Sequence, residues 1–83
     1  MEYERLTIKQ REEMLDQRIL ALEQEHYHHE LNKLANQELA RSGTKERREL
    51  AKENIRQAES AQRELEALLD ALRGKNRRRT TKR

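Results

Sequence analysis

The sequence contains no proline and only two glycines, so almost nothing in it forces a helix to stop. Charged residues make up 42% of the chain and hydrophobic residues 33%. A chain of 83 residues with so little apolar surface cannot build a broad globular core. These features together predict an all-α protein made of long, largely solvated helices.

One short break divides the helical sequence. Ser42, Gly43 and Thr44 form the turn 42–44, in which Gly43 is expected to take the left-handed conformation and Thr44 to cap the following helix. We therefore expect helix one over about 2–41 and helix two over about 45–73, closed by Gly74. Because the connection is so short, residues 1–74 are predicted to form one antiparallel, coiled-coil-like helical hairpin.

Apolar residues recur along both expected helices. In helix two every seventh residue is apolar from Ala51 to Leu72, and Asn54, Ala61 and Leu68 fill the alternating position. Asn54 is either a register-fixing polar group or a solvated end of the seam. Helix one carries two stripes that differ in rotation around its axis. The first stripe is Ile8, Leu15, Ile19 and Leu22, and the second stripe is Leu20, Tyr27, Leu31 and Leu34.

Folding the chain about Gly43 places residue i opposite roughly 86 − i. This register sets Leu34, Leu31 and Tyr27 against the mostly small residues of 51–61. It sets Leu15, Ile19 and Leu22 against the leucines of 65–72. Two helices alone leave much apolar surface in water, so we expect a dimer that forms a four-helix bundle. The expected oligomer seam consists of Leu15, Ile19, Leu22, Leu65, Leu68 and Leu72. One long helix in a parallel coiled coil is the alternative.

The segment 23–30 is rich in histidine and glutamate. Pairs spaced three or four residues apart lie on one helix face, as in di-iron carboxylate bundles. The expected seam of helix two offers no matching glutamate, and the histidines point in different directions. We therefore predict no metal site and no cofactor. The weak metal candidates are Glu25, His26, His28 and His29.

Positive charge is concentrated at the end of the chain. The sequence holds 19 Lys and Arg residues, six of them among the last nine, which leaves 13 against 16 acidic residues in 1–74. We expect 75–83 to be a disordered basic tail that contacts the phosphates of nucleic acid or another polyanion without sequence preference. The expected nucleic-acid contacts are Lys75, Arg77, Arg78, Arg79, Lys82 and Arg83.

The sequence contains no nucleophilic, acid–base or phosphate-loop motif that suggests an enzyme, and we expect no enzymatic activity. The leading hypothesis is a non-enzymatic helical oligomer that contacts nucleic acid through its tail. The alternative is a coiled-coil adaptor or inhibitor that binds another protein through the spare apolar stripe of helix one. Without a recognisable signal peptide or membrane span, an intracellular location is expected, in a compartment that the residues do not specify.

Overall fold

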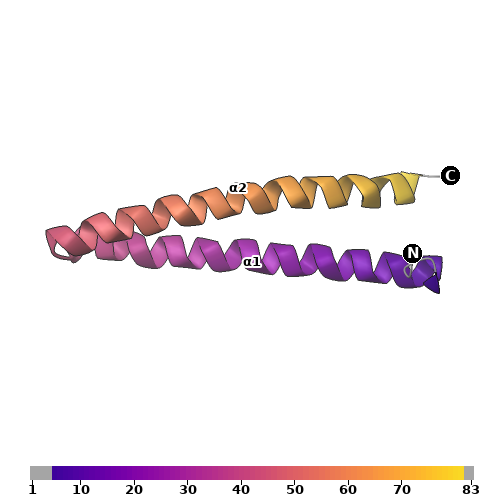
Figure 1. The fold of residues 1–83 in the computed structure, drawn as a ribbon, viewed down its shortest axis with the longest axis horizontal. Helices are drawn as coiled ribbons and strands as arrows, with labels where there is room; N and C mark the ends of the chain where they lie inside the picture. The colour runs from indigo at the N-terminus through magenta and orange to yellow at the C-terminus, as the bar shows by residue number, and fades with distance from the viewer. Residues whose placement is uncertain (1–4, 82–83) are drawn as a thin grey trace.

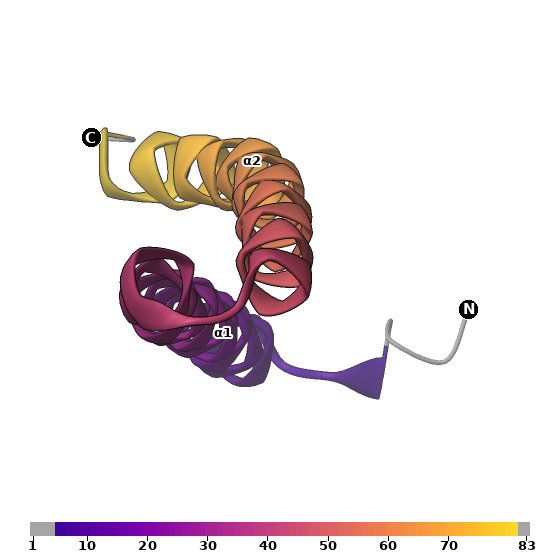
Figure 2. The same cartoon turned by 90° about the vertical axis from the view of Figure 1, so that its left-hand side faces the viewer.

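The computed structural model describes residues 5–81, and for 75–81 it describes the backbone alone. The described chain forms helix α1 (Ile8–Ser42) and helix α2 (Lys45–Thr81), with no strand among these residues. The two helices run antiparallel, so the start of α1 and the end of α2 lie at the same end of the hairpin, opposite the connection (Figure 1). Seen from the connecting end, the helices wrap around each other (Figure 2). The predicted all-α hairpin is therefore confirmed.

Helix α1 begins at Ile8, six residues after the predicted start. Thr7 caps it: its hydroxyl accepts a hydrogen bond from the Gln10 backbone N–H at 3.0 Å, and the Gln10 side chain accepts one from the Thr7 N–H at 2.9 Å. This reciprocal pair satisfies two N–H groups that the first turn otherwise leaves unbonded. The Thr-x-x-Gln spacing was visible in the sequence, and it identifies this start better than helix propensity does.

Gly43 and Thr44, which we call the hinge, connect the helices. Gly43 has φ −85° and ψ 176°, so the predicted left-handed conformation is wrong and the residue is extended. Glycine is needed here for space, because a Cβ atom would lie 2.9 Å from the Leu39 carbonyl oxygen and 3.1 Å from the Arg47 Cβ. The predicted cap at Thr44 is confirmed, since its hydroxyl accepts a hydrogen bond from the Arg47 N–H at 3.3 Å.

Helix α2 continues through Gly74 to Thr81, so its predicted end at residue 73 is wrong. A glycine inside a helix costs about 1 kcal/mol relative to alanine, which weakens a helix without ending it. No described glycine has a positive φ, and the Lys, Asn and Arg residues that follow Gly74 are compatible with helix. Residues 75–81 thus belong to α2 and are not the disordered tail that was expected. The predicted contacts Lys82 and Arg83 lie outside the described residues.

Leucines form the core in the middle of the hairpin. Leu22, Leu65 and Leu69 are buried together, with Ile19 and Leu72 packed against them. Ala51 and Ala58 are the buried apolar residues of α2 nearer the hinge. Leu68, predicted at the seam, is 51% exposed, while Leu69 takes its place at 4%. The buried residues of α2 therefore form two series with a spacing of seven. One series is Ala51, Ala58 and Leu65, and the other, four residues later in the repeat, is Gln62 and Leu69.

The observed register differs from the predicted one. Asn36 contacts Asn54 and His26 contacts Glu66, so opposing residue numbers sum to about 90 or more. Side chains on a helix lean toward its N-terminus. In an antiparallel pair this brings an α2 residue into contact with an α1 residue that lies closer to the hinge than simple folding predicts.

Candidate functional site

The second stripe of helix one lies on the outside of the hairpin. Leu20, Tyr27, Leu31 and Leu34 are 54%, 61%, 45% and 50% exposed, and we call them the outer stripe. The expectation that Leu34, Leu31 and Tyr27 pack against the alanines of α2 is therefore wrong. Polar residues of α1 take that place: Asn36 contacts Asn54, and Glu30 accepts a hydrogen bond from Gln62. The outer stripe is a candidate surface for binding another helix.

Acidic residues bracket the outer stripe along the helix axis. Asp16 lies four residues before Leu20 and Glu38 four residues after Leu34, which places each on the same helix face as the stripe. The Glu38 carboxylate is 3.4 Å from the guanidinium of Arg41, and both side chains are three-quarters exposed. The stripe is therefore an apolar strip with a carboxylate near each end.

Polar contacts join the helices beyond the leucine core. His26 Nε2 lies 2.8 Å from Glu66 Oε2, and the Arg73 guanidinium donates a hydrogen bond to the Glu23 carboxylate. These four side chains and Leu69 line an open hollow of about 280 Å³. Because the paired groups remain partly exposed, each pair stabilises the hairpin by less than about 1 kcal/mol.

Gln62 is the one polar residue buried among those described, at 5% exposure. Its side-chain amide donates to the Glu30 carboxylate at 3.0 Å and to the His26 carbonyl oxygen at 3.3 Å. The hydrogen bond from Gln62, together with Lys33, lowers the pKa of Glu30. Gln62 thus fastens α2 to two consecutive turns of α1.

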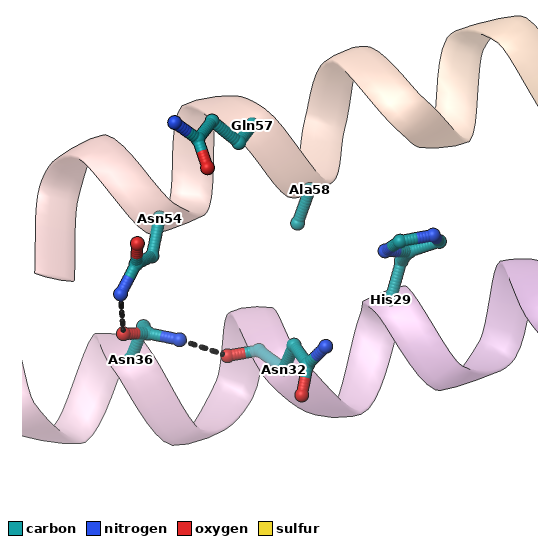
Figure 3. A pocket seen from close by; sticks show the side chains of 6 residues that line it. All are labelled: His29, Asn32, Asn36, Asn54, Gln57 and Ala58. Carbon is teal, nitrogen blue, oxygen red and sulfur yellow. Dashed lines mark hydrogen bonds between the residues drawn. The ribbon is translucent and has the colours of Figure 1, made fainter.

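An amide-rich hollow of about 380 Å³ lies between the leucine core and the hinge (Figure 3). The Asn54 side chain donates to the Asn36 side-chain oxygen at 3.2 Å, and Asn36 donates to the Asn32 carbonyl at 2.8 Å. Asn54 is half-buried and has a partner on the other helix, as the register-fixing interpretation requires. The hollow is lined by His29, Asn32, Asn36, Asn54, Gln57 and Ala58.

The histidine-rich segment spreads around α1. His26 faces Glu66, the rings of His28 and His29 approach edge-on with centroids 6.4 Å apart, and Glu25 is exposed. Among residues 5–74, whose side chains the structure describes, no group of three or more His, Asp or Glu residues is arranged to hold a metal ion. The structure therefore does not bring the four weak metal candidates together.

No helix in the described part of the chain is long and apolar enough to span a membrane. Comparison of the chain with protein-family models, with curated proteins and with solved structures found no match.

Proposed function

We propose that this chain is a non-enzymatic interaction module that binds a helix of another protein along the outer stripe of α1. One observation carries the proposal: four large apolar side chains lie on one face of α1 and remain about half exposed or more. Their spacing of seven, four and three residues is the spacing through which helices pack side by side. Burying them against a partner helix removes this apolar surface from water.

The charges beside the stripe indicate the chemistry of the partner. Asp16 and Glu38 favour a helix that carries an apolar stripe of about two heptads with lysine or arginine at its ends. Such residues add specificity and speed of association more than affinity.

A pair of designed helical peptides tests this proposal. Both carry the same leucine stripe, one with lysines and one with glutamates at its ends. The lysine peptide should bind more tightly. Leu31→Lys with Leu34→Lys should weaken binding of that peptide by at least about tenfold, because burying the exposed half of each leucine contributes roughly half of the 1.5–3 kcal/mol of full burial. Leu39→Lys with Leu50→Lys is the matched control, since these leucines are also exposed but lie outside the stripe. Equal losses in both variants would refute the site.

Nucleic-acid binding through the C-terminal residues is a second candidate function, favoured by the charge distribution. Six of the last nine residues are basic, whereas the rest of the chain has more acidic than basic residues. Truncation after Gly74 removes all six charges and keeps Leu22, Leu65 and Leu69. If all six neutralise phosphates, the logarithm of affinity for duplex DNA should fall with that of salt at a slope of about −5. A truncated chain that binds equally well would exclude this candidate.

The expected dimer of hairpins in a four-helix bundle also remains a proposal. Of its expected seam, Ile19, Leu22, Leu65 and Leu72 pack inside one hairpin, and Leu15 is partly buried but outside that cluster. This leaves Leu68 and the outer stripe for contact between hairpins. Sedimentation equilibrium at micromolar concentration tests it, and a folded monomer would refute it.

A further inference from the structure

The hinge is a minimal connection. Only Gly43 and Thr44 separate α1 from α2, and Gly43 has an extended backbone that requires no left-handed conformation. The Gly43 N–H still donates to the Leu39 carbonyl at 3.0 Å, and the Arg48 N–H donates to the Thr44 carbonyl at 2.8 Å. Helical hydrogen bonding therefore continues almost to the break from both sides. Rotation of the backbone at these two residues, above all of Gly43 ψ from 176° to the helical value of about −42°, would make the helix continuous.

The inner faces of the two helices are in phase across the hinge. Asn36 and Asn54 lie 18 residues apart, which equals five turns at about 3.6 residues per turn. Leu22 and Ala58, both buried in the hairpin, lie 36 residues apart, or ten turns. A hairpin does not require this relation, because each helix rotates independently at the break. A continuous helix does require it if both inner faces are to lie on one side.

We propose that two copies of this chain exchange α2 by straightening at the hinge, forming an antiparallel dimer of continuous helices. The inner face of each α1 is then covered by α2 of the second copy. All the contacts described between α1 and α2 can re-form between the two chains, because an antiparallel two-fold axis through the hinge reproduces the hairpin register. This inference is independent of the proposed function.

The hairpin and the dimer with exchanged α2 contain nearly the same contacts between α1 and α2. The conformation of the hinge therefore decides which of the two states is more stable. Straightening adds helical backbone hydrogen bonds at 42–45 and loses the Thr44 cap, while association costs translational and rotational freedom. Short connections favour exchange between copies, and longer ones disfavour it. Glycine at position 43 favours the hairpin, because its missing Cβ leaves room for Leu39 and Arg47.

The decisive variant is Gly43→Ala, which introduces that Cβ and favours continuous helix. The association constant should rise by at least about fivefold per hinge, the value expected from helix propensity alone. Gly74→Ala is the matched control: it makes the same change inside α2, where a Cβ meets nothing within 4 Å, so dimerisation should not change. Sedimentation equilibrium measures both.

A cysteine pair distinguishes exchange from side-by-side association. The sequence contains no cysteine, so Asn36→Cys with Asn54→Cys introduces a single pair at an observed contact between the helices. Oxidation should give mainly a disulfide-linked dimer in the Gly43→Ala background. It should give mainly an intrachain bond when Gly-Ser-Gly is inserted after Gly43. A Gly43→Ala chain that stays monomeric would overturn the proposal, as would a dimer that forms only intrachain disulfides. An equal fraction of disulfide-linked dimer in the Gly43→Ala chain and in the chain with the Gly-Ser-Gly insertion would also overturn it.

Discussion

Replacing Leu22 by alanine tests whether the leucine core holds the hairpin together. Leu22 is 2% exposed and packs with Leu65 and Leu69. Buried Leu→Ala changes cost about 2–5 kcal/mol, through lost burial and the cavity left behind. Only two helices surround this site, so they can partly close the space, and we expect a loss of about 2–3 kcal/mol.

Leu68→Ala is the matched control, because it makes the same change in an exposed position of the same hairpin. Leu68 is 51% exposed, so its truncation should cost less than about 1 kcal/mol. The gain in helix propensity is the same for both changes and cancels in the comparison. Urea unfolding followed by circular dichroism at one protein concentration measures both values. A loss at Leu68 equal to or larger than that at Leu22 would refute the assignment of the inner face.

Three further changes probe the polar contacts and the cap. The pKa of Glu30 is lowered by Gln62 and Lys33, so its carboxylate stabilises the hairpin above the ordinary glutamate range and loses that effect as pH falls through the lowered value. The urea midpoint should therefore drop less between pH 6 and pH 3 in Glu30→Gln than in the parent. Gln62→Ala should cost about 1–2 kcal/mol by removing two hydrogen bonds at a buried site, whereas Arg73→Ala should cost less than about 1 in the same urea assay, because its ion pair is exposed. Thr7→Ala should cost about 1 kcal/mol and shift the Cα resonances of the first turn toward random-coil values, and unchanged shifts would show that the capping box is dispensable.

Sequence patterns were sufficient to predict the hairpin, its hinge and the cap at Thr44. They were insufficient to choose between Leu68 and Leu69, because both extend the same seven-residue repeat and the choice depends on how far α2 rotates toward α1. That rotation is a property of the packed pair. Ala61 and Asn54, which belong to the same repeat as Leu68, are partly buried, whereas Leu68 is exposed.

The location of the outer stripe could not be predicted for a related reason. The sequence shows two apolar stripes on helix one, and pairing large residues with the alanines of helix two is a reasonable rule of packing. The rule fails here because Asn36 and Gln62 make specific hydrogen bonds between the helices and bring polar residues of α1 to the inner face. Amide side chains between the helices, of which Gln62 is buried and Asn36 and Asn54 are half-buried, thus override the apolar pattern between the leucine core and the hinge.

The uneven distribution of apolar side chains along the hairpin has a consequence for its local opening. Leu22, Leu65 and Leu69 lie in the middle, while small side chains and the amide-rich hollow lie toward the hinge. Local opening free energy follows buried apolar contact, so backbone amide protons should exchange most slowly in 19–26 and 62–69. Amides on both sides of the hinge should exchange faster, although only two residues separate the helices there. The hairpin would then open from both ends toward its centre, and its connected end would be no more protected than its free end.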